Sequence, residues 1–356
     1  MTTTVETTIN QILNSVAERR ATDIHFDIGS NPFIRVNGKL VSLPDVAVVN
    51  KEFLDALIKY FVPAEQLELL KKRKEIKFVF PWKDKARFKV HIFKQKGSHS
   101  VSLKLITGQI LSLEKLGVPK VISSFSRASS GLIIVTGAFN SGRSTTLAAI
   151  IDEINKSRKE RILLLEKPIE HLFINDQSFI EQREIGNDVN SFTEGLVSIS
   201  DQDINVVVLS EVDNLKTLEA LLEMAESGRL VLVIMNYDTV ISCIQGIVSD
   251  FPEAKKKWVR DVLAKYLVGI IAQKLIPDVK GDQALAVEIL TSSDSGKSLI
   301  KDGRFANLES IIQTSRAQGM ISMDMSLAEL VRMGRIDQQE AAKYATDPKT
   351  IAKLFR

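Results

Sequence analysis

The stretch GLIIVTGAFNSGRSTTLAAI, residues 131–150, decides how the chain folds. It reads as a short apolar run, then a loop of glycine and small polar residues, then the start of a helix. Gly137, Gly142, Arg143 and Ser144 follow the pattern G-x-x-x-x-G-K-[ST] at every position except the lysine. Backbone N–H groups in such a loop, with the amino terminus of the following helix, bind phosphate groups. The sequence therefore predicts a phosphate-binding loop between a buried strand and a helix.

Two residues of this loop bear on what it can do. Asn140 stands where the loop often needs a positive φ, which asparagine tolerates better than most residues. Arg143 carries the charge of the missing lysine on a bulkier planar fork, and a misplacement of about 1 Å costs roughly 100-fold in rate. The alternative is a plain strand–turn–helix joint whose glycines serve packing. The predicted nucleotide-binding residues of the loop are Gly137, Asn140, Ser141, Gly142, Arg143, Ser144 and Thr145.

The bulk composition is that of an ordinary globular protein. Of 356 residues, 26% are charged and 44% are hydrophobic, which is enough for two domains. A net charge of +3 does not indicate a nucleic-acid partner, and a single cysteine excludes an intramolecular disulfide framework. The amino terminus lacks the pattern of a secretory signal, and no apolar run approaches the ~18 residues that span a bilayer. We therefore expect a cytoplasmic protein without direct membrane insertion.

The chain changes character along its length. Residues 1–106 combine helical patterns with strand-like segments, which predicts a small α+β domain on an antiparallel sheet. Residues 107–120 hold turn residues and are expected to form a linker. Residues 121–356 alternate apolar strands (LIIV, RILLL, NVVVL, RLVLVIM) with helices, which predicts an α/β fold with a parallel sheet. The tail from about Pro252 is expected to be mostly helical.

Segments spread over nearly the whole chain share motifs with one family. EKPIE resembles an acidic box E-D-P-I-E, VVVLSEVDN a strand that ends in G-E-[MIL]-R-D, and AESGRLVLVIMNYDTV a histidine box. ATDIHFDIGSNPFIRVNGKL and ARFKVHIFKQKG resemble two conserved segments of the same family's first domain. In order and spacing, these motifs resemble the type IV pilus retraction ATPases of the PilT/PilU type, within the hexameric secretion ATPases. The resemblance implies a PAS-like first domain, a RecA-like core and a ring of six subunits.

The departures from the family pattern cluster at the positions expected to bind or cleave the nucleotide. Arg143 replaces the lysine of the phosphate loop, and Lys167 replaces the aspartate of the acidic box. Asp213 replaces an arginine after the next core strand, where Ser210 also replaces a glycine. Both histidines of the histidine box are absent, their positions holding Arg229 and Asn236. Scaffold segments match the family, so the catalytic positions have changed selectively.

Two carboxylates are the candidates for catalysis. Ser144 is expected to hold Mg²⁺ through its hydroxyl, with Glu211 beside the metal or polarising the attacking water. Glu166 is the second candidate for orienting water. The alternatives are a solvated strand-end carboxylate for Glu211 and a turn or helix-cap carboxylate for Glu166. The resemblance adds Arg87 to the nucleotide-binding residues.

Other substituted positions leave two interpretations open. Lys167 either repels Mg²⁺ or places an ammonium near the phosphates in place of the missing lysine; we favour repulsion, because an added cation beside a metal opposes its binding. Arg229 is either a phosphate contact or a surface arginine. At Lys89 and Lys96 the family has arginines that reach ATP on the neighbouring subunit.

Together these features predict a family member that binds ATP and Mg²⁺ but hydrolyses ATP poorly. It would act in twitching motility as a subunit of a homo-hexamer or of a mixed ring with an active paralogue. Its expected partner is an inner-membrane pilus platform protein, which would make it peripheral at that membrane. Two alternatives stay open: an active retraction motor with altered site residues, and a ring scaffold that binds no nucleotide.

Overall fold

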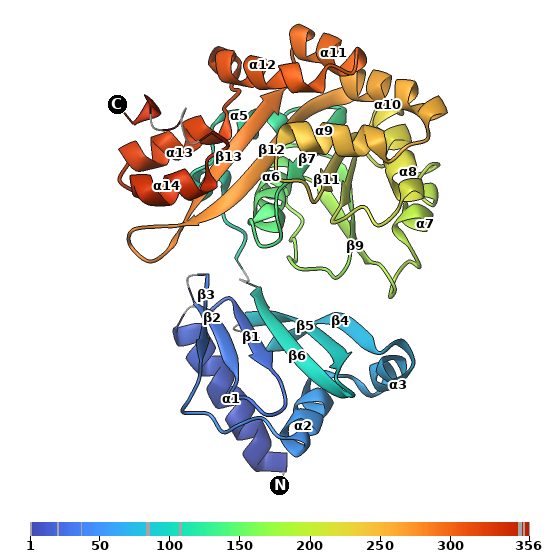
Figure 1. Ribbon diagram of the computed structural model, residues 1–356. Helices are drawn as coiled ribbons and strands as arrows, with labels where there is room; N and C mark the ends of the chain where they lie inside the picture. The colour runs from blue at the N-terminus through green and yellow to red at the C-terminus, as the bar shows by residue number, and fades with distance from the viewer. Residues whose placement is uncertain are drawn as a thin grey trace. The chain divides into compact units, whose positions relative to one another are not determined.

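The computed structural model describes residues 2–19, 21–36, 38–82, 86–106, 109–347, 351 and 353–355. The chain divides into two compact units, Met1–Gln109 and Ile110–Arg356 (Figure 1). Residues 107–120 were expected to link two domains. From Ile110 onward they belong to the second unit, where Leu113 is buried in the core.

The first unit is built on a six-stranded antiparallel sheet in the order β3-β2-β1-β6-β5-β4. On β5, Phe88, Val90 and Ile92 are buried and alternate with more exposed residues, because successive side chains of a strand point to opposite faces. The strands are β1 (Asp23–Phe26), β2 (Phe33–Val36), β3 (Lys39–Ser42), β4 (Glu75–Trp82), β5 (Ala86–Gln95) and β6 (Ser98–Ile106).

Helices cover the apolar face of this sheet. Buried side chains of α1 (Thr2–Glu18) and α2 (Lys51–Phe61) share one core with the strands, and both helices lie on the same face in Figure 1. Helix α3 (Ala64–Arg73) precedes β4. The α+β unit expected from the sequence is confirmed.

The second unit contains a seven-stranded sheet in the order β13-β12-β7-β11-β10-β8-β9. All neighbouring strands are parallel except β12 and β13, which are antiparallel. The four apolar runs of the sequence are β7, β8, β10 and β11, as predicted. The strands are β7 (Gly131–Thr136), β8 (Arg161–Glu166), β9 (Phe179–Glu184), β10 (Val206–Leu209), β11 (Leu230–Ile234), β12 (Leu267–Pro277) and β13 (Gln283–Thr291).

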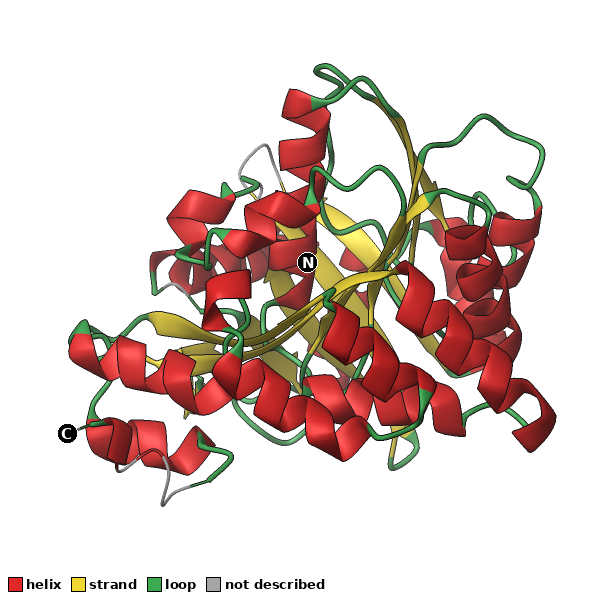
Figure 2. Ribbon diagram, turned by 90° about the horizontal axis from the view of Figure 1, so that it is seen from above, coloured by secondary structure: helices red, strands yellow, loops and turns green. Residues whose placement is uncertain are grey.

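Helices pack on both faces of this sheet (Figure 2). On β7, Leu132 and Ile134 pack against α8, α9 and α10, whereas Ile133 and Val135 face α6. The helices are α4 (Leu113–Leu116), α5 (Val121–Phe125), α6 (Arg143–Ser157), α7 (Phe192–Val197), α8 (Leu215–Glu226), α9 (Val240–Ser249), α10 (Glu253–Tyr266), α11 (Asp294–Lys301), α12 (Leu308–Thr314), α13 (Met323–Arg332) and α14 (Gln338–Tyr344), with 3-10 turns at Phe305–Asn307 and Arg316–Gln318. No helix in the described ranges is both long and apolar enough to cross a bilayer.

The chain after Pro252 differs from the mostly helical tail that the sequence predicts. Helices α10 to α14 are present, but β12 and β13 lie among them and extend the sheet beside β7. Periodicity missed them because a short apolar run such as LVGIIAQKLIP fits a buried strand or a buried helix equally well. The difference matters for function, since β12 carries a residue that contacts the phosphate loop.

Candidate nucleotide site

The loop that joins β7 to α6 has the backbone of a phosphate-binding loop; we call residues 137–144 the phosphate loop. Its φ angles are 149° at Gly137, 64° at Asn140 and 85° at Gly142, all in the range that favours glycine. The positive φ predicted for Asn140 is therefore confirmed. Helix α6 begins at Arg143 after the glycine N-cap, and no side chain caps it. The N–H groups of its first turn are thus available to an anion.

A buried glutamine on β12 holds the phosphate loop in this shape. Gln273 is fully buried, and its Nε2 donates to the carbonyl oxygen of Ser141 at 2.7 Å. A Cβ at Gly137 would lie 2.5 Å from the Gln273 carbonyl oxygen and 2.5 Å from Ser141 Oγ. Residue 137 must therefore be glycine for space as well as for φ. Gln273 was not among the residues predicted from the sequence, although a polar residue within an apolar run is a usable signal.

The side chain of Arg143 is bound to the chain segment that follows β11. Its Nη1 donates to the carbonyl oxygen of Met235 and to Oδ1 of Asn236. Burial lowers the pKa of the guanidinium, and the nearby carboxylate of Glu170 opposes this shift. Asn236 was expected to occupy a histidine-box position, and Glu170 is the last residue of the acidic box EKPIE, but neither was predicted to lie beside Arg143. The proximity of Asn236 depends on the sheet order, which places β11 next to β7.

Ser144 and Thr145 occupy the first turn of α6 and are half-buried. Ser144 therefore stands where its hydroxyl can meet a metal bound to phosphates in the loop. The described residues contain no group of three or more His, Cys, Asp or Glu side chains that could hold a metal by themselves. Mg²⁺ commonly binds through one or two protein oxygens together with substrate phosphates and waters. A site at Ser144 is consistent with this coordination.

Glu211 lies at the same edge of the sheet as the phosphate loop. It follows β10 by two residues, and β10 is joined to β7 through the parallel strand β11. The carboxyl ends of parallel strands meet at one edge, where ligands of such sheets bind. Ser210, which replaces the family glycine, accepts a hydrogen bond from the backbone N–H of Lys167 at 3.1 Å. The strand ends of β8 and β10 are thereby tied together.

Glu166 is the last residue of β8 and is 8% exposed. Its Oε1 accepts a hydrogen bond from Nε2 of Gln182 at 2.8 Å, and its carboxyl also accepts one from the backbone N–H of Glu170. Burial raises its pKa to about 7, which the Gln182 hydrogen bond opposes. The bond to Glu170 closes the turn that contains the cis Lys167–Pro168 peptide. These contacts support the turn-carboxylate interpretation.

Comparison with known proteins identifies the family. Residues 2–352 match the model of the Type II/IV secretion system protein family. The chain belongs to this family. It is 32% identical over 343 residues to the type IV pilus retraction ATPase PilT of Pseudomonas aeruginosa, covering 96% of this chain and 99% of that one. It is also 27% identical over 348 residues to the type IV pilus ATPase PilU of the same organism, covering 97% of this chain and 91% of that one.

Solved structures agree with this assignment. A crystal structure of the pilus retraction motor PilT with bound ADP has a TM-score of 0.83 and 31% identity, covering 96% of this chain and 98% of that one. The DotB ATPase of Legionella pneumophila shares the fold, with a TM-score of 0.81, 20% identity and 94% coverage of each chain. The PilT/PilU-type fold expected from the sequence motifs is confirmed.

Arg229, at one histidine position of this secretion ATPase family, is a structural residue. It immediately precedes β11, at the edge of the sheet opposite to the phosphate loop. Its guanidinium donates to four backbone carbonyls, with distances of 3.0 to 3.4 Å, and to Ser227 Oγ at 2.8 Å. The carbonyls belong to Ile199, Ser200, Gln202 and Ile204. A phosphate contact within this chain is therefore excluded, and Arg229 instead fixes the loop before β10.

Two other predicted residues lie in different units of the chain. Lys167 is exposed and follows β8, at the edge of the sheet where the phosphate loop lies. Arg87 is half-buried on β5 of the first unit, between Pro81 of β4 and Ile106 of β6 in the sheet register. The structure thus brings Lys167 to the edge that carries the predicted catalytic residues, whereas Arg87 belongs to the other unit.

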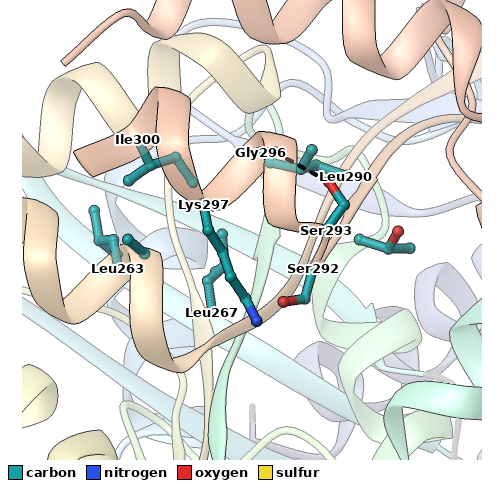
Figure 3. Close-up of a pocket in the computed structure, with 10 residues that line it drawn as sticks. Leu263, Leu267, Leu290, Ser292, Ser293, Gly296, Lys297 and Ile300 are labelled. Carbon is teal, nitrogen blue, oxygen red and sulfur yellow. Dashed lines mark hydrogen bonds between the residues drawn. The ribbon is translucent and has the colours of Figure 1, made fainter. Parts of the chain in front are cut away.

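A separate pocket lies between α10, the ends of β12 and β13, and α11 (Figure 3). Its one charged lining residue is Lys297, and Gly296 N–H donates to Ser293 Oγ there at 3.1 Å. No residue predicted to bind nucleotide lines it. The lining residues are Leu263, Ala264, Leu267, Leu290, Thr291, Ser292, Ser293, Gly296, Lys297 and Ile300.

Proposed function

We propose that this chain is an ATP-binding, hydrolysis-impaired subunit of a type IV pilus retraction motor. One observation carries the proposal. The phosphate loop keeps its backbone shape, while the charge that should meet the outer phosphates sits on Arg143 and is held by the segment after β11. Backbone donors bind phosphates, whereas turnover also requires an accurately placed cation.

The binding half of the proposal rests on the phosphate loop. Gly137 leaves a cradle that any Cβ would fill, and Ser141 Oγ is buried there without a hydrogen-bond partner among the described residues. The loop N–H groups and Thr145 would contact phosphates, and Ser144 would hold Mg²⁺. A bound metal nucleotide would supply the charge that these groups neutralise. The ADP in the PilT crystal structure supports nucleotide as the ligand.

The hydrolysis half rests on the residues around the loop. Phosphoryl transfer depends on positioning and on stabilising charge, so several displaced groups together have a severe effect. Arg143 is longer and bulkier than lysine. Lys167 puts a cation where the family has a carboxylate. The pKa of Glu166, raised to about 7 by burial, leaves this carboxyl largely protonated below neutral pH. Glu211 remains as the carboxylate best placed to polarise water.

The assembly part of the proposal follows from the resemblance to PilT and PilU. We expect a homo-hexamer or a mixed ring with an active paralogue, in which Arg87 contributes to a nucleotide site. The ring would modulate retraction through an inner-membrane pilus platform protein, which would place it at the cytoplasmic side of that membrane.

Two measurements on the purified chain test the proposal. Equilibrium binding of ATP with Mg²⁺ should be detectable, and steady-state phosphate release should not exceed that of the Glu211→Gln variant. Release well above that variant would establish an active motor and overturn the proposed impairment. Failure to bind ATP at all would support the scaffold alternative instead.

A further inference from the structure

We propose that Asn236 is a positioning residue for Arg143. Its hydrogen bond holds the otherwise mobile guanidinium of Arg143 in one orientation, in which it can bind phosphate. This inference rests on the proposed function only in requiring that the phosphate loop bind nucleotide. It concerns the pairing of two residues that both depart from the family pattern.

Asn236 stands on a backbone that is anchored on both sides. Met235 N–H donates to the carbonyl oxygen of Val135 at 3.0 Å. Tyr237 N–H donates to Thr136 Oγ1 at 2.9 Å, and that hydroxyl donates to the Tyr237 carbonyl at 2.8 Å. These bonds fasten the segment to the end of β7, the strand from which the phosphate loop departs. The backbone that carries the Asn236 side chain is therefore fixed relative to the loop.

The hydrogen bonds divide the guanidinium into a held side and an open side. Nη1 has two N–H groups, and its acceptors are the Met235 carbonyl and Asn236 Oδ1. Nε and Nη2 carry the other three N–H groups, and none of them has a hydrogen-bond partner in the described part of the chain. A fork of N–H groups matches phosphate oxygens in two-point contact. Holding one side of Arg143 therefore leaves the other side for the ligand.

The two groups that accept hydrogen bonds from Arg143, the Met235 carbonyl and the Asn236 amide, are both neutral. They therefore leave the positive charge of Arg143 available to a phosphate and do not neutralise it. A carboxylate at residue 236 would cancel the charge of Arg143, whereas an amide oxygen orients the guanidinium and leaves its charge intact. The nearby carboxylate of Glu170 acts on Arg143 electrostatically. A lysine in the loop would concentrate its donors on one nitrogen and would need no such holder. Arg143 and Asn236 are thus complementary substitutions.

A double-mutant cycle tests this inference. The four proteins are wild type, Asn236→Ala, Arg143→Lys and the double variant, and the readout is the Kd of a fluorescent ATP analogue with Mg²⁺. We expect Asn236→Ala to weaken binding about fivefold in wild type and less than about twofold in the Arg143→Lys background, because the bond to Arg143 is then gone. Equal losses in both backgrounds, or tighter binding by Asn236→Ala, would overturn the inference.

Two further readouts separate positioning from a structural effect. Asn236 is exposed, so its truncation should leave thermal unfolding nearly unchanged. Competition by inorganic tripolyphosphate should weaken in Asn236→Ala, while competition by adenosine should not change. Asn236→Asp should weaken nucleotide binding more than Asn236→Ala does, since it neutralises Arg143. If wild type binds no nucleotide, the proposed function itself fails; if it binds and the cycle is additive, only this inference fails.

Discussion

The phosphate loop and the strand ends around it have diverged to different extents. The loop keeps the positions whose role lies in the backbone, including the left-handed conformations at Asn140 and Gly142. The strand ends have exchanged side chains at Lys167, Ser210 and Asn236. Backbone donors tolerate a changed neighbourhood as long as φ is preserved, whereas side-chain chemistry does not. Under the proposed function, this difference would let the site bind phosphate groups while cleaving them poorly.

Gly137→Ala tests most directly whether the phosphate loop binds through its backbone shape. The new Cβ would collide with the Gln273 carbonyl and Ser141 Oγ, and alanine disfavours φ of 149°. We expect ATP affinity to fall by about 1,000-fold, equivalent to roughly 4 kcal/mol. Isothermal titration measures this loss. Gly334→Ala is the control, because it strains a positive φ of 65° in open space away from the loop and should leave affinity unchanged.

Among the residues at the strand ends, Glu166 should make the stability of the protein depend on pH. Burial raises its pKa in the folded state from the ordinary value of 4.5 to about 7, so the folded protein holds the proton more tightly than the unfolded chain. Stability should therefore be highest below pH 4.5 and fall by about 3 kcal/mol as pH rises to 7, relative to Glu166→Gln. Urea unfolding across this range measures it. Parallel profiles for the two proteins would contradict the buried, protonated carboxyl.

The support beneath the loop can be tested through Gln273→Leu. The substitution keeps a similar volume but leaves the Ser141 carbonyl without its donor, so the free energy of unfolding should drop by about 2 kcal/mol. ATP affinity should fall with it, since the loop loses its brace. Gln313→Leu on the exposed side of α12 is the matched control and should change stability by less than about 0.5 kcal/mol. An unchanged midpoint in urea for Gln273→Leu would show that the brace is dispensable.

Lys167→Asp has the smallest expected effect and distinguishes the two interpretations of that residue. If Lys167 repels Mg²⁺, Mg²⁺ should increase ATP affinity by a larger factor in the variant than in the wild type. We expect that factor to be about fivefold larger, or roughly 1 kcal/mol. Lys159→Asp makes the same charge change at the opposite edge of the sheet and should have little effect. Unchanged Mg²⁺ dependence in Lys167→Asp would remove the repulsion hypothesis.

Local patterns were sufficient for part of the molecule. The four apolar runs, the phosphate loop and the φ of Asn140 could be predicted, because each follows from neighbouring residues along the chain. The bond between Gln273 and Ser141 could not, since it joins residues 132 positions apart through a strand pairing that local periodicity does not encode. Arg229 was ambiguous for a similar reason: only the sheet order shows that it lies at the edge away from the loop.

The glutamine beneath the loop also determines how a ligand arrives. Its bond to Ser141 is shielded from water, and breaking it would strand buried polar atoms at a cost of about 1–3 kcal/mol. The bond consequently holds the phosphate loop in one shape. A preformed loop loses little conformational entropy when a ligand binds. The nucleotide binding that we propose should therefore need no slow rearrangement of this loop.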